Sequence, residues 1–302
     1  MDPLSDILSL LRPKTAISAG LDAGGEWAIQ FPAHHGIKFN TVTQGACWVS
    51  VANQAEPALR IEAGDCFLLT RGLPFLFATD EAPLPIDSAT IYDNAINGVA
   101  TCNGGGDFYL IGGRFSFEGD HAGLLFDALP PIVHVRDASN QAAVLRWSLE
   151  QLAMELKQGS PGGALMADHL AQIMLLQVLR LWLASDKRSG WLGALADPRL
   201  TRALSALHAA PGRRWTLADL AGFAGMSRTS FAERFRDVVG QTPLDYLAGW
   251  RMRLAADRLY RSDDSVAAIG FSVGYGSEAA FSTAFRRMMG RTPMQYRRAA
   301  VS

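Results

Sequence analysis

The residues best suited to chemistry in this 302-residue chain stand beside two copies of one motif. Residues 235–246 read FRDVVGQTPLDY and residues 285–296 read FRRMMGRTPMQY, an offset of 50 that keeps Phe, Arg, Gly, Thr, Pro and Tyr in register. Such registration indicates two copies of one supersecondary unit. The side chains expected to face outwards are small or able to hydrogen-bond: Arg228, Thr229, Ala232, Glu233 and Arg236 in the first copy, and Ser277, Glu278, Ala279, Ser282, Thr283 and Arg286 in the second.

These outward residues suit a helix that enters the major groove of DNA. Small side chains let such a helix sit deep, arginines read guanine or hold phosphate, and glutamates can accept from the cytosine amino group. A solvated surface glutamate is the alternative for Glu233 and Glu278. Thr242 and Thr292 are predicted N-caps of the following helices, whose free N–H groups can contact a DNA phosphate. A helix cap without a ligand is the alternative for both threonines.

A helix-turn-helix in each copy would position these side chains. Ala221 with Gly225, and Gly270 with Gly274, supply a small residue at the helix crossing and a glycine able to adopt positive φ in the turn. Residues 244–261 read as one long helix between the copies. A rigid helix there would hold the two recognition helices about 34 Å apart, one turn of B-DNA, so that one chain could enter two successive major grooves.

The charge of the chain is divided unevenly. From Asp197 to the end there are sixteen arginines, no lysine and nine acidic residues, a net of +7, which leaves −8 for residues 1–196. A basic segment joined to an acidic one indicates that the C-terminal third faces an anion such as double-stranded DNA. A chance excess of solvated arginines is the alternative.

Residues 1–135 read as short apolar strands separated by turns, which predicts an antiparallel sandwich or barrel. Residues 136–190 read as a helical hairpin and linker with Leu145, Leu149, Leu152 and Leu156 on one stripe. The hairpin has more apolar surface than it can bury alone, so we expect a homodimer, with packing onto the sheet domain as the alternative. Residues 191–302 form the third predicted segment.

The C-terminal third resembles the AraC/XylS family of bacterial transcriptional regulators. The matching stretches are DPRLTRALSALH (197–208), WTLADLAGFAGMSRTSFAERFRDVVGQTPLDYL (215–247), WRMRLAADRL (250–259) and IGFSVGYGSEAAFSTAFRRMMGRTPMQYRR (269–298). The resemblance implies an all-α double helix-turn-helix domain that binds DNA and controls transcription, often through contacts with RNA polymerase.

The N-terminal domain resembles the cupin-like β-barrel that this family commonly joins to its DNA-binding domain. In the stretches GIKFNTVTQG (36–45) and GDCFLLTRGLPF (64–75), Gly64 and Gly72 fit the cupin motifs. The metal-ligand positions depart from them, because Lys38, Asn40 and Gln44 stand in the places of His, His and Glu, and Phe75 stands in the place of the last His. Without imidazole and carboxylate donors we expect no metal and no cofactor.

Control by a small effector in the N-terminal domain is the function that this resemblance implies. A pocket lined by Trp48, Phe39 and Arg114 is our candidate site, with plain core packing as the alternative. Cys102, in the sequence TCNGGG, is the cysteine expected to be exposed and therefore the candidate for a redox signal. Cys47 and Cys66 lie inside apolar runs and are expected to be inert core residues.

Two other classes of function compete with the regulator. One is a metal-dependent cupin enzyme with an accessory DNA-binding domain, although no catalytic triad, phosphate loop or dinucleotide fingerprint is present in the sequence. The other is an architectural DNA binder without sequence preference. We expect a cytoplasmic protein without a membrane partner, because the first residues lack a signal-peptide pattern and the apolar segment 164–184 carries Asp, His and Arg.

Overall fold

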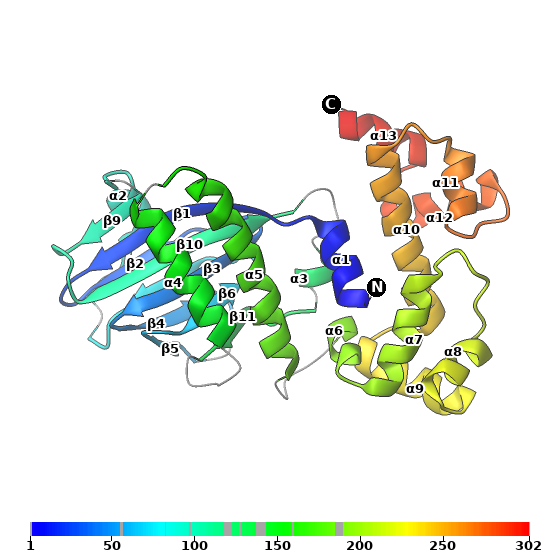
Figure 1. Cartoon of the computed structure of the whole chain (residues 1–302), viewed down its shortest axis with the longest axis horizontal. Coiled ribbons are helices and arrows are strands. Elements are labelled where there is room, and N and C mark those ends of the chain that lie inside the picture. The colour runs from blue at the N-terminus through cyan, green and yellow to red at the C-terminus, as the bar shows by residue number, and fades with distance from the viewer. Residues whose placement is uncertain are drawn as a thin grey trace. The chain divides into compact units, whose positions relative to one another are not determined.

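The computed structural model describes residues 2–54, 57–81, 83–96, 98–117, 123–126, 128–136, 143–158, 160–184 and 190–301. They divide into two compact units, shown in Figure 1. The sheet unit holds the described residues of Pro13–Glu118 and Ala122–Lys187, and the helical unit holds those of Met1–Arg12 and Arg188–Ser302. The hairpin therefore groups with the sheets, and the first twelve residues group with the C-terminal helices. Most of the linker predicted near residue 186 lies outside the described residues.

The sheet unit contains two mainly antiparallel sheets that remain open. The six-stranded sheet has the order β11-β6-β3-β10-β1-β9, in which the strands are β11 (Ile132–Val135), β6 (Cys66–Leu69), β3 (Ile37–Gln44), β10 (Phe108–Ser116), β1 (Lys14–Ala23) and β9 (Val99–Cys102). The five-stranded sheet has the order β5-β4-β7-β2-β8, in which they are β5 (Leu59–Glu62), β4 (Ala46–Val51), β7 (Phe75–Ala78), β2 (Ala28–Phe31) and β8 (Ile86–Asp87). The β-rich prediction is confirmed, but a closed barrel is not, because each sheet ends in short edge strands.

The main core of this unit lies between the two sheets. Val42 of β3 and Leu110 of β10 pack in it with Val49 and Phe77 of the five-stranded sheet. Since side chains alternate along a strand, Lys38 and Asn40 share the inner face with Val42, whereas Phe39 lies on the opposite face. Short helices α2 (Ser88–Tyr92) and α3 (Gly123–Phe126) complete the unit with the hairpin.

The hairpin consists of α4 (Ala143–Gln158) and α5 (Gly163–Ala184). Leu145, Leu149 and Leu152 of α4 are buried, as the sequence predicts, and the side chain of Leu156 lies outside the described part of the structure. Helix α5 packs against α4, β1 and β11, and the Asp168 carboxylate accepts from the backbone N–H of Thr15 at 3.2 Å. Judged by length and composition alone, α5 is long and apolar enough to cross a membrane. One such helix is weak evidence for a membrane span, because the core helix of a soluble protein passes the same test.

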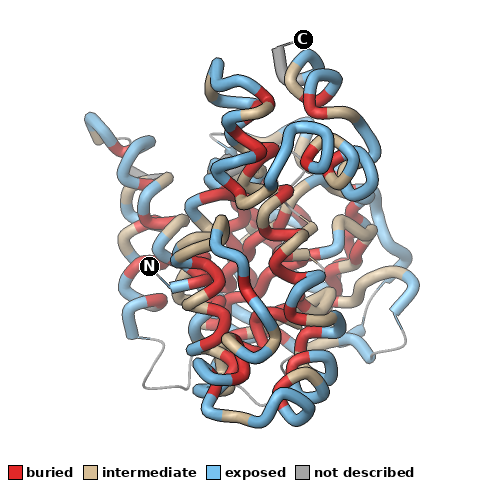
Figure 2. Tube along the Cα trace, turned by 90° about the vertical axis from the view of Figure 1, so that its right-hand side faces the viewer, coloured by how far each residue is buried: buried red, intermediate tan, exposed pale blue. Residues whose placement is uncertain are grey.

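The helical unit repeats one arrangement along its length. It contains α1 (Pro3–Leu11), α6 (Gly190–Leu195), α7 (Pro198–Ala209), α8 (Leu217–Ala224), α9 (Arg228–Val239), α10 (Pro243–Arg261), α11 (Val266–Ser272), α12 (Glu278–Met289) and α13 (Pro293–Val301). Figure 1 shows α7–α9 at one end of α10 and α11–α13 at the other. In Figure 2, buried positions gather where the helices meet, and exposed positions lie on the outside.

Glycines permit the close contacts inside each helix-turn-helix. Gly225 follows α8 with φ +65°, and Gly274 follows α11 with φ +92°, so both take the left-handed conformation expected of them. At Gly270 an added Cβ would lie 2.9 Å from Cβ of Phe281, which is closer than side-chain packing allows. In the first copy Ala221 occupies the corresponding position and is buried.

We predict that Gly274→Ala destabilises the helical unit by roughly 1–3 kcal/mol, because alanine resists positive φ and its Cβ would meet the carbonyl oxygen of Gly212. Gly276→Ala is the matched control, since its Cβ would meet no atom within 4 Å. Thermal unfolding of the full chain, followed by circular dichroism, measures both variants. Equal melting temperatures for the two variants would contradict this account of the turn.

Candidate nucleic-acid interface

Helix α9 is held to its unit by two phenylalanines one helical turn apart. Phe231 and Phe235 are fully buried, with ring centroids 5.7 Å apart. Ser227 caps the helix by accepting from the backbone N–H of Ser230 at 3.2 Å, and Gly240 ends it with φ +84°. The buried pair fixes the rotation of the helix, so that Arg228, Thr229, Glu233 and Arg236 face outwards and are exposed.

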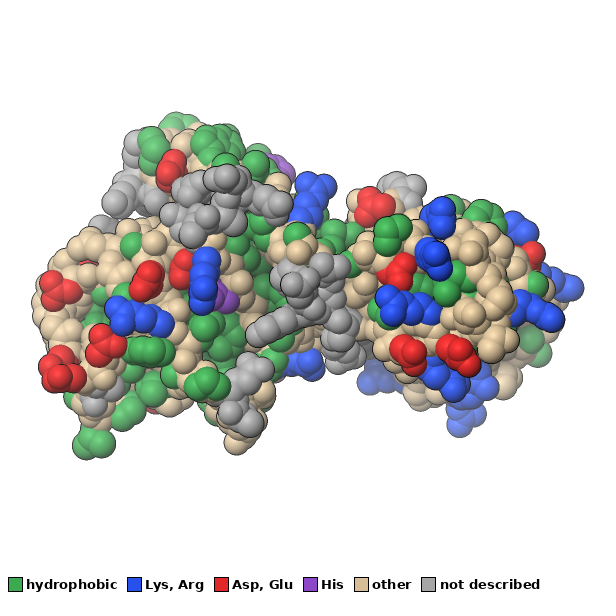
Figure 3. Space-filling model, turned by 90° about the horizontal axis from the view of Figure 1, so that it is seen from below, with side chains coloured by type: hydrophobic (Ala, Val, Ile, Leu, Met, Phe, Trp, Pro, Cys, Tyr) green, Lys and Arg blue, Asp and Glu red, His purple; other side chains and the backbone are tan. Residues whose placement is uncertain are grey.

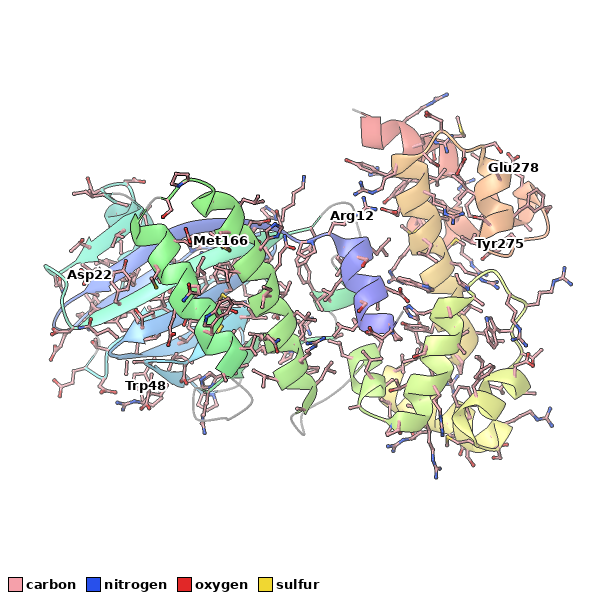
Figure 4. All side chains as sticks on the ribbon, viewed as in Figure 1. Arg12, Asp22, Trp48, Met166, Tyr275 and Glu278 are labelled. Carbon is pink, nitrogen blue, oxygen red and sulfur yellow. The ribbon has the colours of Figure 1, made fainter. Side chains whose placement is uncertain are left out.

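Helix α12 repeats this construction with different outward residues. Phe281 and Phe285 are fully buried with centroids 5.6 Å apart, Ser277 is the N-cap and Gly290 ends the helix with φ +73°. Glu278, at the start of the helix (Figure 4), is exposed together with Ala279, Thr283 and Arg286. Ala232 of α9 and Ser282 of α12 are half-buried, so they lie at the margins of the two outward faces.

The two exposed faces belong to one body joined by α10. This helix runs from Pro243 to Arg261 without a break, as the sequence predicts, and spans about 28 Å at 1.5 Å per residue. Its buried residues are shared between the two copies: Tyr246 lies against Phe235, and Met252 and Leu259 belong to the core around Phe281 and Phe285. Packing at both ends of α10 therefore sets the separation of the recognition helices.

The two threonine caps differ in charge. Thr242 donates to the carboxylate of Asp245 at 2.6 Å and accepts from its N–H at 3.2 Å, so α10 begins with an acidic side chain. Thr292 accepts from the N–H of Gln295 at 3.2 Å, and its own N–H donates to the Gln295 amide at 3.0 Å. The N-terminus of α13 is therefore the more favourable of the two for a phosphate, because Asp245 would repel one at α10.

The arginines of the helical unit fall into two groups. Arg251 donates to the carbonyls of Pro211 and Arg213, and Arg234 pairs with Asp197 at 3.1 Å, so these side chains stabilise the fold. Among the residues that the structure describes, the outward-facing Arg228, Arg236 and Arg286 have no hydrogen-bond or ion-pair partner for their side chains. Figure 3 shows basic side chains spread over the surface of this unit. An exposed cation without a protein partner is available to a phosphate or a base edge.

Helix α1 belongs to this unit through a buried histidine that sequence reasoning missed. His208 of α7 shares a hydrogen bond with the Tyr246 hydroxyl at 2.8 Å, stacks on Trp250 with centroids 4.3 Å apart, and lies 3.3 Å from the Asp6 carboxylate. Burial lowers the pKa of His208 to about 4. The apolar stripe of α1, which includes Ile7 and Leu11, is buried as well. An N-cap aspartate followed by proline marks this helix in the sequence, but nothing there indicates its partner.

The residues suggested as an effector pocket do not come together. Trp48 of β4 lies on the outer face of the five-stranded sheet, where its indole N–H donates to Asp80 (Figure 4). Phe39 packs on Phe115 at 5.0 Å, on the face of β3 that points away from the other sheet. Arg114 is opposite Lys38 in the register of β10 and β3. A cavity of about 280 Å³ does lie between the sheets, but its walls include none of these three residues.

The prediction that Cys102 is exposed is wrong. All three cysteines are buried, and Cys102 is only 3% exposed because the end of β9 packs into the core between the sheets. Burial raises the pKa of the Cys47 and Cys66 thiols to about 12 and also raises the pKa of Cys102. A buried thiol that stays protonated is a poor nucleophile towards oxidants.

The positions that correspond to cupin metal ligands form no metal site. Lys38, Asn40 and Phe75 all line the cavity between the sheets, whereas Gln44 points to the loop and donates to the carbonyl of Gly106. Within the described ranges, no three His, Cys, Asp or Glu side chains are grouped as metal ligands. An ammonium, an amide and a phenyl ring do not fit a divalent cation.

Comparisons with known proteins agree with both halves of this architecture. A family model described as a cupin matches residues 2–184, and one described as a helix-turn-helix domain matches residues 220–299. A putative AraC-like transcription regulator of Streptomyces lividans is 45% identical over 99% of this chain and 98% of its own. The HTH-type transcriptional regulator AlkR of Acinetobacter baylyi is 31% identical over 98% of this chain and 99% of its own.

A solved structure is also similar in sequence. The DNA-binding domain of the global transcriptional factor AdpA, in complex with a target DNA, is 35% identical and covers 34% of this chain and 92% of that one, with a TM-score of 0.32.

A cupin sheet unit joined to paired helix-turn-helix motifs defines a DNA-binding regulator of transcription. The chain belongs to the AraC family of these regulators, because its sequence is similar to the Streptomyces and Acinetobacter proteins over nearly the whole length of each chain. It is a DNA-binding protein that regulates transcription.

Proposed function

We propose that α9 and α12 read two successive major grooves of one DNA site. The observation that carries this proposal is the pair of exposed helix faces, each fixed by two buried phenylalanines and each bearing arginine and small polar side chains. Arg228, Thr229, Glu233 and Arg236 contact one groove, with Ala232 at the margin. Glu278, Ala279, Thr283 and Arg286 contact the next, with Ser277 and Ser282 beside them.

Phosphate contacts hold the two helices in register on the DNA. In this proposal the Thr292 hydroxyl and the backbone N–H of Met294 donate to a phosphate at the start of α13, with Arg291 exposed beside them. Thr242 contributes less, because Asp245 occupies the first turn of α10. Phosphate contacts position the protein without reading sequence, so specificity rests on α9 and α12.

The sheet unit acts as a sensor in this proposal, and the protein has no catalytic role. A small effector bound between the sheets changes promoter occupancy or the contact with RNA polymerase by favouring one conformation of the protein. Three buried thiols and a cavity with a fixed cation favour a small molecule over an oxidant as the signal. The protein acts in the cytoplasm, where its DNA target lies.

A homodimer formed through the hairpin completes the proposal. On α4 the exposed apolar side chains are Val144, Trp147 and Met154, which follow the spacing of one helical stripe. Met166 and Ile173 continue an apolar face on α5, where Met166 is labelled in Figure 4. Apolar stripes on an antiparallel helix pair can be covered by the same surface of a second copy.

Genome-wide occupancy tests the regulator. Replacing Arg228, Thr229, Ser282 and Thr283 together with alanine is expected to abolish the sequence-specific peaks, because each lost base contact costs about 1–3 kcal/mol. The control is Arg199→Ala, which removes an exposed arginine of α7 and leaves both recognition helices intact. Unchanged peaks in the fourfold variant would refute the assignment of the recognition helices. Uniform occupancy by the wild-type protein would instead indicate an architectural DNA binder.

Sedimentation velocity tests the dimer. Trp147→Glu places a charge in the apolar stripe of α4, so we expect the dimer to dissociate at least roughly tenfold more readily. Leu84→Glu is the matched control, because Leu84 is 91% exposed and lies outside the hairpin. A dimer that is equally stable in both variants would exclude the hairpin as its interface.

A further inference from the structure

The cavity between the sheets combines an apolar wall with a smaller set of polar side chains: Lys38, Asn40, Asp87, Ser88 and Tyr92. Phe31, Phe75, Tyr92 and Leu110 supply rings and aliphatic surface around a volume of about 280 Å³. Phe31 and Phe75 stack on each other with centroids 4.5 Å apart and planes within 6° of parallel. The volume is near the lower end of ordinary ligand sites, so a compact molecule fits it better than a long chain.

The cationic group of this cavity is the ammonium of Lys38. Its Nζ lies 5.2 Å from the ring centroid of Phe31 and 4.9 Å from that of Phe75, so both rings hold the cation in place. In the part of the chain that the structure describes, no carboxylate lies within ion-pair distance of it. Burial, followed by the nearby guanidinium of Arg114, lowers the pKa of Lys38. An anion beside the ammonium would offset both the cost of burying this charge and the repulsion from Arg114.

Asn40 offers a second donor to the same cavity. Its side chain is 5% exposed, and its amide nitrogen has no hydrogen-bond acceptor among the described residues. A buried donor without an acceptor costs free energy in the folded protein, and an oxygen atom of a ligand would remove that cost. Lys38 and Asn40 are two residues apart on β3, so both side chains project from one face of one strand.

Other charged groups near the cavity favour a single negative charge. The ring of His34 lies edge-on to Phe75, and burial, with the charge of Lys38, lowers the pKa of His34 to about 4, so it stays neutral at pH 7. Asp87, also in the cavity wall, is exposed and accepts from the backbone N–H of Ala89 at 2.8 Å. Its carboxylate would repel a second acidic group on the ligand.

We propose that this cavity binds a small monocarboxylic acid with an aromatic or compact apolar body, whose carboxylate meets Lys38 and Asn40. The ammonium and the amide stand at positions where the cupin resemblance places metal-binding histidines, so a fixed protein cation replaces the metal. The inference rests on the proposed sensor function, for which it names the class of effector. The phenylalanine rings hold the body of the acid, and the two donors exclude neutral analogues that cannot accept as strongly.

Calorimetric titration of the full-length protein, without DNA, tests the ligand class directly. The probes are benzoate, 1-naphthoate and cyclohexanecarboxylate, compared with the neutral benzamide, the cationic benzylamine and the dianionic terephthalate. We expect at least one monocarboxylate to bind roughly tenfold to a hundredfold more tightly than benzamide, since hydrogen bonds to charged groups contribute that much. Lys38→Met should remove this preference, and Lys38→Arg should retain it.

The control variant is Arg60→Met, which removes a cation from the outer face of the five-stranded sheet. Three results with the wild-type protein would overturn the proposal: equal binding of benzoate and benzamide, tighter binding of benzylamine, or no detectable binding of any of the three monocarboxylates. None of these results depends on whether Lys38→Met folds. DNA binding measured with and without the bound acid is a separate readout. An acid that binds through Lys38 without changing DNA binding would contradict the sensor function and leave the ligand class intact.

Discussion

The paired phenylalanines of α9 and α12 are the constraint on which the proposed reading of DNA depends. Phe231 with Phe235, and Phe281 with Phe285, are fully buried, and each buried phenylalanine contributes about 1.5–3 kcal/mol. Because the two rings are one turn apart, they fix the rotation of the helix as well as its position. The outward residues can then vary without disturbing the fold. The residues repeated between the two copies therefore anchor the helices, and in our proposal the residues that differ between the copies carry the specificity.

The sheet unit shows how a cupin scaffold can hold charge without a metal. Lys38, Asn40 and Phe75 line its cavity, so a cation, a free amide donor and an aromatic ring lie where the resemblance places metal ligands. The Lys38 ammonium is held by cation–π contacts with Phe31 and Phe75, so the proposed acid would meet a protein cation in place of a divalent ion. This arrangement is the basis of the proposed role of the sheet unit as a sensor of a small acid.

Local signals made the helical unit largely predictable from sequence. Gly240 and Gly290 end their helices with positive φ, and the long helix expected over 244–261 is α10. Contacts between residues far apart in the sequence were harder to predict. The partner of α1 lies some two hundred residues away at His208, and strand register decides that Lys38 faces the cavity while its neighbour Phe39 does not. A shift of one residue reverses the two faces of a strand, so the pocket could not be assigned before the register was known.

The central claim is that α9 and α12 read separate grooves of one DNA site. Selection of bound sequences from a random DNA library, using Thr229→Ala and Thr283→Ala as separate variants, tests it most directly. The account predicts that each variant relaxes preference in one half of the wild-type site only, and that the two affected halves lie about ten base pairs apart, one helical turn. The claim would be contradicted if both variants lost base preference at the same positions of the site. It would also be contradicted if either variant kept the wild-type preference in both halves.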